Sequence, residues 1–118
     1  MHEMSLVEAL MEALLEAFEK HPNWLRARRV ELHVGRLRQV VPEAMIFCFD
    51  VASRGTPLEG ACLDLVEIPL EAFCEACGHR WGPEDLVFFC PACGSVDVET
   101  VAGMDLDIAS MEVEEGDG

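Results

Sequence analysis

The clearest pattern in the sequence is a run of apolar residues at helical spacing near the N-terminus. Between Ser5 and Lys20 these residues recur every three or four positions, and glutamates occupy much of the remainder. The apolar positions are Leu6, Val7, Leu10, Met11, Leu14, Leu15 and Phe18. Such spacing places them on one face of a helix. Ser5 with Glu8 has the form of a capping box and Pro22 supplies a stop, so we predict an amphipathic helix from Ser5 to about Lys20.

The middle of the chain alternates between strand and helix signals. From Arg29 to Gly35 apolar and polar residues alternate, as they do in a strand with one buried face. Pro42 opens a second helical stretch that extends to about Ala52, because proline suits the first turn of a helix. The segment 62–68 is apolar and rich in β-prone residues, which predicts a second strand.

A third strand is expected late in the chain. Two segments fit it, 96–104 and 106–113, with Gly103 as a turn or bulge at the break. Together with the two helices, these strands predict an α+β fold with a small mixed sheet. The cysteine-rich segment from Cys74 to Cys93 lies between sheet segments and is therefore expected to form an inserted, zinc-ribbon-like module.

Composition and charge narrow the range of functions. The chain has 118 residues, 51% of them hydrophobic, which suits one compact core with a small satellite module. Its formal net charge of -15 makes nucleic acid and anionic membranes unlikely partners, since both attract basic surfaces. Metal cations or basic protein patches would be attracted, although acidity can also serve solubility alone. With no apolar span and no signal peptide in the sequence, we expect a cytoplasmic protein.

Four cysteines form two closely spaced pairs. Cys74 and Cys77 are separated by two residues, as are Cys90 and Cys93, and a glycine follows each pair. This spacing lets two thiolates face one cation, and two such pairs complete a tetrahedron with metal–sulfur distances of about 2.3 Å. A structural zinc site is predicted, because four thiolates leave no open position on the metal.

Other interpretations of the cysteines stay open. A rubredoxin-type iron site uses the same four-thiolate coordination, and the sequence from Cys90 to Gly94 resembles one of its turns. Disulfides or free buried thiols are less in keeping with the paired spacing. Cys48 and Cys62 fall in a predicted helix and strand, so we assign them to packing.

The first three residues offer a different set of ligands. The α-amine of Met1, the backbone nitrogen of His2 and the imidazole of His2 can close adjacent chelate rings around one ion. Ni(II) and Cu(II) favour such nitrogen-rich, tetragonal sites, and Glu3 could complete the set. Met1 is expected to be retained because the residue after it is bulky.

The ordered set of motifs resembles the HypA/HybF family of hydrogenase maturation factors. The resemblance starts with Met1-His2-Glu3 and the amphipathic helix, and it covers essentially the whole chain. Its other motifs are Val34-Gly35-Arg36-Leu37, Val41-Pro42-Glu43, Glu59-Gly60-Ala61 with Leu63, the two cysteine pairs, and Gly103-Met104-Asp105-Leu106.

This resemblance implies a nickel metallochaperone with two domains. A nickel-binding α/β domain would comprise residues 1–69 and 97–113, the inserted zinc domain 70–96, and an acidic tail 114–118. His2 would be the nickel ligand, with Met1 and Glu3 as its neighbours. The residues implied as zinc ligands are Cys74, Cys77, Cys90 and Cys93.

The resemblance also implies partners, namely a GTPase maturation factor and the large subunit of a nickel–iron hydrogenase. A homodimer stays open, as does a role for His79 in tuning the zinc site. The sequence shows no nucleophile with an adjacent base, so we expect no enzymatic activity. Two competing functions remain, an iron-based electron carrier and a zinc-ribbon module that binds other proteins.

Overall fold

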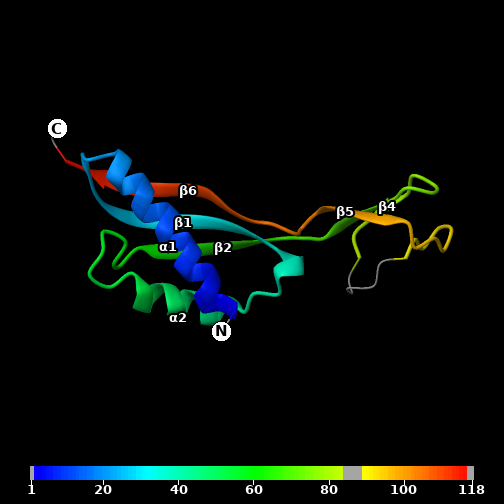
Figure 1. Cartoon of the computed structure of the whole chain (residues 1–118), viewed down its shortest axis with the longest axis horizontal. Coiled ribbons are helices and arrows are strands. Elements are labelled where there is room, and N and C mark those ends of the chain that lie inside the picture. Colours follow the sequence, from blue (N-terminus) through cyan, green and yellow to red (C-terminus); the bar gives the residue numbers. More distant parts are fainter. Residues whose placement is uncertain (1, 84–88, 117–118) are drawn as a thin grey trace. The chain divides into compact units, whose positions relative to one another are not determined.

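The computed structural model describes residues 2–83 and 89–116, except for the side chain of His2. Its first element is helix α1 (His2–Lys20), which confirms the predicted N-terminal helix (Figure 1). The predicted apolar face is buried through Val7, Leu10, Met11, Leu14 and Phe18. The predicted capping box is wrong, because the helix begins three residues before Ser5. Half-buried Met4 extends the apolar stripe in that direction, so the helix continues through Ser5.

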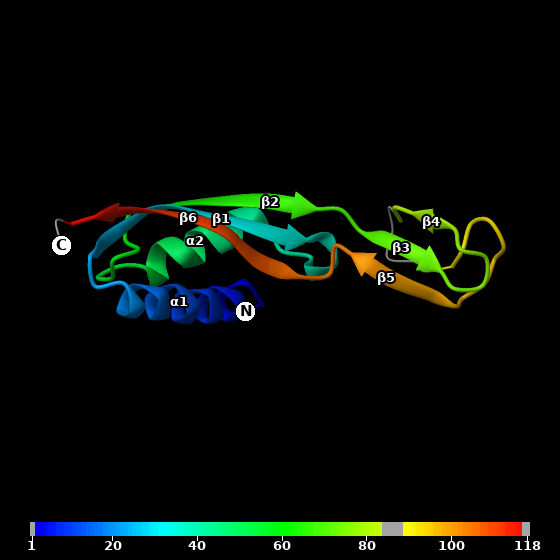
Figure 2. The same cartoon turned by 90° about the horizontal axis from the view of Figure 1, so that it is seen from above.

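Three strands form the first sheet, in the order β2-β1-β6. They are β1 (Trp24–Gly35), β2 (Cys62–Ile68) and β6 (Leu106–Glu115). Figure 2 shows β1 and β2 running in one direction and β6 in the other, with both helices on the same side of the sheet. The sheet is therefore mixed, as predicted. Strand β2 has the predicted bounds, and β1 begins five residues earlier than expected.

Helix α2 (Pro42–Ala52) connects β1 to β2 and starts with proline in its first turn, as predicted. It packs against α1 and buries Met45, Cys48 and Phe49. Val30 and Leu32 of β1 are completely buried as well, so the core lies between the sheet and the helices. Within the described ranges, neither helix has the length and apolar character that crossing a membrane requires.

A second, smaller sheet has the order β4-β3-β5. Its strands are β3 (Glu71–Cys74), β4 (Arg80–Trp81) and β5 (Val98–Ala102), and both pairings are antiparallel. Sequence patterns did not predict β3 or β4, because strands of four and two residues are too short to show alternation. Both segments considered for a late strand are strands, and they belong to different sheets.

Contacts along the chain divide it into two units. The first unit comprises residues 1–32, 40–65 and 108–118, and the second comprises residues 33–39 and 66–107. Strand β6 includes Glu114 and Glu115, which the sequence analysis placed in an acidic tail. The next residue, Gly116, donates its N–H to the Asn23 carbonyl at 2.7 Å. The acidic residues Glu114 and Glu115 are therefore part of the first sheet.

Two glycines allow backbone segments to meet within the second unit. A Cβ on Gly35 would lie 2.4 Å from the Gly103 carbonyl carbon, and one on Gly103 would lie 2.5 Å from the Pro69 carbonyl oxygen. Gly103 also has a φ of +86°, a conformation that favours glycine. The Leu37 N–H, in the short 3-10 helix Arg36–Arg38 that follows β1, donates to the Gly103 carbonyl at 2.9 Å. Two of the motifs behind the family resemblance thus contact each other directly.

The packing prediction for the two remaining cysteines is half correct. Cys48 is 1% exposed, as expected, but Cys62 is exposed. Cys62 and Asp64 lie two residues apart on β2, so they face the same side of the sheet. On that side Arg29 forms an ion pair with Asp64, which marks it as the polar face. The prediction for Cys62 was wrong because β-propensity does not show which face of a strand is buried.

Candidate metal centre

The described part of the chain brings four thiols together in the second unit. Their Sγ atoms all lie within 4.8 Å of one another. The Cys74 and Cys93 sulfurs are 3.7 Å apart, and the Cys77 and Cys90 sulfurs are 3.6 Å apart. Four sulfurs at about 2.3 Å from a tetrahedral ion would be about 3.8 Å apart, so the cluster has the size for one such ion. All four cysteines that the sequence predicted as ligands are therefore adjacent in space.

The two cysteine pairs lie on turns of the same geometry. In the first turn the Gly78 N–H donates to the Cys74 carbonyl at 2.8 Å, and in the second the Gly94 N–H donates to the Cys90 carbonyl at 2.8 Å. Gly78 and Gly94 have φ values of +81° and +76°. A side chain would strain the backbone at both positions, so the glycine after each pair is part of what forms the turn.

The turns also bury their cysteines in the same pattern. The first cysteine of each pair is almost completely buried, with 0% exposure for Cys74 and 1% for Cys90. The second cysteines, Cys77 and Cys93, are exposed. The cluster therefore has one side against the protein and one side toward solvent.

The thiols of the metal-free cluster differ in acidity. Burial raises the pKa of Cys90, but backbone N–H groups of Cys93 and Ala92 and a hydrogen bond with the Cys77 thiol lower it to about 7. A backbone hydrogen bond from His79 lowers the pKa of Cys77, but hydrogen bonds with the other thiols, together with burial, raise it to about 12. Because metals bind the thiolate, Cys90 is closer to its binding form than Cys77, and Cys77 must give up a proton when a metal binds.

His79 lies beside the cluster and does not join it. Its ring stacks on Trp81, with 5.6 Å between ring centroids and 11° between ring planes. Within residues 2–83 and 89–116, the group of side chains able to hold a metal contains the four cysteines alone. The His79 carbonyl accepts a hydrogen bond from the Cys74 N–H at 2.9 Å. In this structure His79 therefore supports the first cysteine turn through its backbone.

The other predicted ligands lie at the N-terminus. Met1 and the side chain of His2 lie outside the described residues. Helix α1 begins at His2, and the first N–H groups of a helix have no acceptor within the helix. The backbone nitrogens of His2 and Glu3 are thus not committed to the hydrogen bonds of α1.

Glu3 makes a contact that the sequence did not reveal. Its carboxylate accepts a hydrogen bond from the Val41 N–H at 3.3 Å, across 38 residues of sequence. Val41 is the N-cap of α2, and its own side chain makes no capping hydrogen bond. A negative charge near a helix N-terminus is favourable, so Glu3 supports the start of α2. No local sequence signal connects two residues so far apart.

Comparisons with known proteins identify relatives along nearly the whole chain. Residues 1–113 match the family described as hydrogenase/urease nickel incorporation, metallochaperone, hypA. The hydrogenase maturation factor HypA of Chlorobium limicola is 42% identical over 117 residues, covering 99% of this chain and 100% of the relative. The corresponding factor of Methylocella silvestris is 40% identical over 114 residues, covering 97% and 100%.

A solved structure has the same fold. The solution structure of the Ni metallochaperone HypA from Helicobacter pylori superposes with a TM-score of 0.70 at 25% sequence identity. The superposition covers 96% of this chain and 97% of the other. The arrangement of two helices and small sheets described above is therefore shared with this Ni metallochaperone.

Proposed function

The chain belongs to the HypA family of nickel metallochaperones, and from that premise we propose that it binds Ni(II) at its N-terminus and delivers it during hydrogenase maturation. The proposed nickel ligands are the α-amine of Met1 and the backbone nitrogen and imidazole of His2, with Glu3 completing the set. A structural Zn(II) ion is proposed in the cysteine cluster. Its ligands would be Cys74, Cys77, Cys90 and Cys93.

The observation that carries the nickel site is the start of α1 at His2. A backbone nitrogen must lose its proton to bind Ni(II), and inside a helix that would remove a hydrogen bond. In the first turn it removes none, because the N–H has no helical acceptor. The partial positive charge at a helix N-terminus also favours loss of protons from nearby groups. Ni(II) prefers planar, nitrogen-rich coordination of this kind.

A delivery protein must also release its ion, and a terminal site suits this task. Its ligands are few, and α-amines and imidazoles in general titrate between about pH 6 and 8, so protons compete with the metal near neutrality. Transfer would proceed by ligand exchange within a complex. The proposed partners are a GTPase maturation factor and the large subunit of a nickel–iron hydrogenase, and the proposed location is the cytoplasm. No catalytic step is needed for this function.

The zinc assignment rests on the size and chemistry of the cysteine cluster. Sulfurs 3.6 and 3.7 Å apart fit around one tetrahedral ion. Zinc would supply no redox chemistry, and four thiolates would leave it no open position, so its role would be to hold the two cysteine turns together. This role suits the second unit, whose strands β3 and β4 have only four and two residues.

Metal analysis with nickel titration tests both sites on untagged protein with its native N-terminus. The protein and its His2→Ala variant would be compared by elemental analysis and by calorimetric titration with Ni(II). His21→Ala is the matched control, because His21 is an exposed histidine just beyond the other end of α1. We expect one zinc per chain in all three proteins and loss of the tight nickel site in His2→Ala alone.

Other outcomes would reject the proposal. Unchanged nickel binding in His2→Ala would exclude the N-terminal site, and equal losses in both histidine variants would point to general weakening. Iron as the tightly held metal, with visible absorption, would favour an electron carrier.

A further inference from the structure

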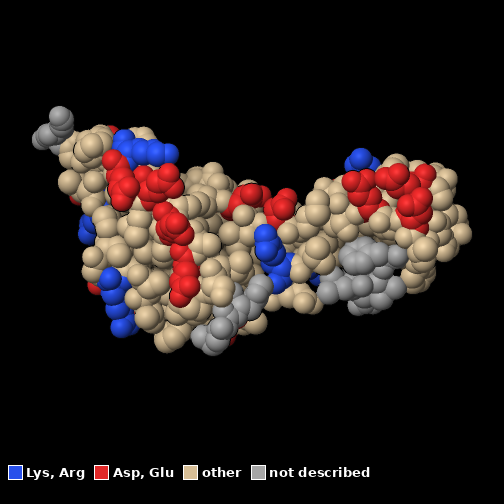
Figure 3. Space-filling view, in the orientation of Figure 1, with Lys and Arg blue, Asp and Glu red and all other residues tan. Residues whose placement is uncertain are grey.

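Helix α2 leaves apolar side chains exposed on the side away from its buried face. Phe47 is 65% exposed, Ile46 46% and Val51 37%. Helix α1 differs, because a row of acidic side chains follows its outer face (Figure 3). These exposed residues include Glu8, Glu12, Glu16 and Glu19. Apolar side chains that are exposed next to one another mark a surface where a partner binds, so a partner is expected on the open side of α2.

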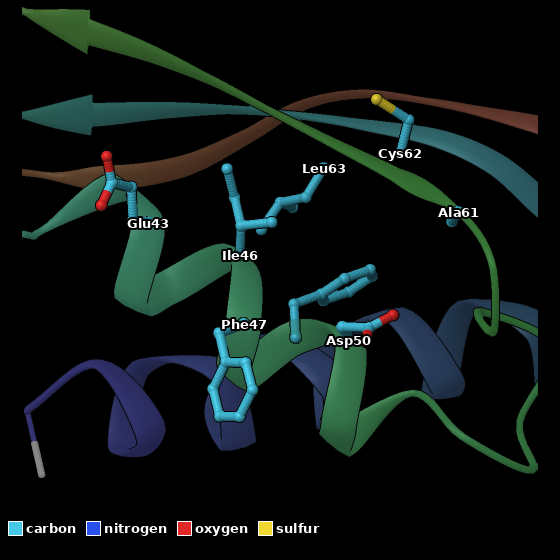
Figure 4. Close-up of a pocket in the computed structure, with 8 residues that line it drawn as sticks. Glu43, Ile46, Phe47, Asp50, Ala61, Cys62 and Leu63 are labelled. Carbon is cyan, nitrogen blue, oxygen red and sulfur yellow. The ribbon is translucent and has the colours of Figure 1, made fainter.

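The exposed side of α2 borders a groove within the first unit. The groove has a volume of about 600 Å³ and lies between α2 and the first residues of β2. Ile46 and Leu63 face each other there, and Glu43 and Asp50 lie toward the two ends of the helix (Figure 4). The groove therefore has apolar walls and a carboxylate near each end.

The groove also follows an edge of the first sheet. Strand β2 is the outermost strand in the order β2-β1-β6, and α2 lies on the β2 side of the sheet (Figure 1). An edge strand presents backbone N–H and C=O groups that can pair with another strand. A strand added next to β2 would lie over Ile46, which faces Leu63 across the groove (Figure 4). One segment could thus pair with the backbone of β2 and cover Ile46.

We propose that this groove binds an extended segment of a partner protein that pairs with the edge of β2 and carries basic residues on either side of an apolar one. The apolar residue would pack on Ile46, and the basic residues would meet Glu43 and Asp50. These carboxylates are seven residues apart, or about 10 Å along a helix. Residues four apart in a strand span about 13 Å, which long basic side chains can accommodate.

The charges on the groove select the occupant. Asp50 already has one ion pair, with Arg54 at 3.7 Å, but both side chains are about two-thirds exposed and such a pair is weak. A second copy of the chain is a poor occupant, because a symmetric contact would bring the same carboxylates together in two molecules of net charge -15. A basic segment of a different protein meets no such repulsion. This inference does not depend on either metal assignment.

A short labelled peptide, acetyl-Thr-Lys-Thr-Leu-Thr-Lys-Thr-amide, is the probe for the charge and apolar parts of the proposal. Binding to the full-length protein would be followed by fluorescence anisotropy at physiological salt. We expect the double variant Glu43→Lys/Asp50→Lys to weaken binding about tenfold or more, since it replaces two attractions by two repulsions. Glu8→Lys/Glu12→Lys is the matched control with the same change in net charge, and it should weaken binding less than about threefold.

Backbone methylation of the same peptide tests strand pairing. Methylating one alternate set of amides removes the N–H groups that face β2, and methylating the other set removes groups that face solvent. We expect one methylated peptide to lose binding and the other to retain it, with hydrogen-exchange protection of residues 62–65 by the peptides that bind.

Several outcomes would overturn the proposal. One is the absence of peptide binding at concentrations below about 1 mM. Another is an equal loss of affinity in the groove variant and the α1 variant, or an equal effect of the two methylation patterns on affinity. A third is hydrogen-exchange protection that maps outside residues 43–65. Self-association that Phe47→Ser abolishes, measured by sedimentation, would assign the groove to a second copy and also overturn it.

Discussion

The cysteine cluster and the N-terminal segment, the two proposed metal-binding regions, are built in opposite ways. The cluster is enclosed by two turns of the same backbone geometry, and its four ligand atoms lie within 4.8 Å of one another. The proposed nickel ligands lie at one chain end, at the start of α1, and they come from consecutive residues. The first arrangement positions ligands before a metal arrives. The second would take its ligands from adjacent residues of one short segment.

This difference explains how one small protein could hold one metal permanently and carry another. A site whose ligands are anchored on two separate turns resists dissociation, because several anchored groups must separate together. A chelate at a chain terminus can be dismantled one ligand at a time by a receiving site. The comparison therefore predicts that changes to the cluster act on metal retention and folding, and that changes at the terminus act on nickel alone.

The largest effect is expected from removing one ligand of the cluster. Cys77→Ser should weaken zinc binding by more than about 100-fold. Losing a residue that only hydrogen-bonds to a metal ligand costs up to about 100-fold in metal affinity, and losing a ligand itself should cost more. Nickel stoichiometry should stay unchanged. Zinc would be measured by competition with a chromogenic chelator, and nickel by titration of the same preparation.

Cys62→Ser is the matched control for that variant. Cys62 is likewise exposed, but it lies on β2 outside the cluster. Its substitution should alter neither metal. Equal zinc loss in both variants, or loss of nickel together with zinc in Cys77→Ser, would contradict the separation of the two regions.

The next largest effect is expected on stability, from a substitution in the backbone of the second unit. Gly103→Ala should lower the free energy of unfolding by about 3 kcal/mol, because it adds a close contact with the Pro69 carbonyl to the strain of positive φ. Gly55→Ala has a φ of +77° but nothing within 4 Å of the added carbon, so about 1 kcal/mol is expected. Denaturant titration of zinc-loaded protein would measure both. Similar losses would show that conformational strain alone, and not the close approach, accounts for the effect.

Acidification should separate the two metals. Nickel binding displaces protons from the amine and imidazole, so its affinity should fall with decreasing pH, by up to about 100-fold per unit once both groups protonate. Zinc affinity must fall in the same direction, because two thiols of the metal-free cluster are protonated at pH 8. The pKa of Cys77 is raised to about 12. A backbone hydrogen bond from Ser95 lowers the pKa of Cys93, but burial and the Cys74 thiol raise it by more.

Two measurements check this prediction. Calorimetry in buffers of different ionisation enthalpy should show at least two protons released per zinc at pH 8. Dialysis at pH 6 should remove nickel and leave zinc in place, since four anchored thiolates start from the stronger binding. Simultaneous loss of both metals during the dialysis would mean that the two sites do not differ in retention.

Sequence patterns predicted the elements with strong local signals. Pro42 marked the start of α2, the bounds of β2 were correct, and the glycine after each cysteine pair indicated the two turns of the cluster. The start of α1 was missed because a good capping pattern at Ser5 competed with an apolar stripe that extends to Met4. Local preference was overridden there by packing.

The features that sequence patterns missed depend on contacts between distant segments. Gly35 and Gly103 belong to two motifs that are far apart in the sequence, and the sequence does not indicate that these motifs contact each other. The exposure of Cys62 depends on which face of β2 the helices cover, and the exposed apolar side of α2 depends on where the sheet ends. Each of these requires the arrangement of elements in space, which alternation and spacing along the chain do not contain.

The smallest effect is expected at Glu3, the neighbour of the proposed nickel ligand His2. Its carboxylate accepts a 3.3 Å hydrogen bond from Val41, a long bond near the surface, so Glu3→Gln should barely change stability. If Glu3 binds Ni(II) through its backbone nitrogen, the substitution should change nickel affinity less than about threefold. If Glu3 binds through its carboxylate, the loss of nickel affinity should exceed about tenfold. Titration with Ni(II) measures this, with Glu8→Gln as the control on the same helix. Because the proposed terminal site relies on backbone and amine nitrogens, we expect the smaller change, and a tenfold loss confined to Glu3→Gln would add a side-chain ligand to that site.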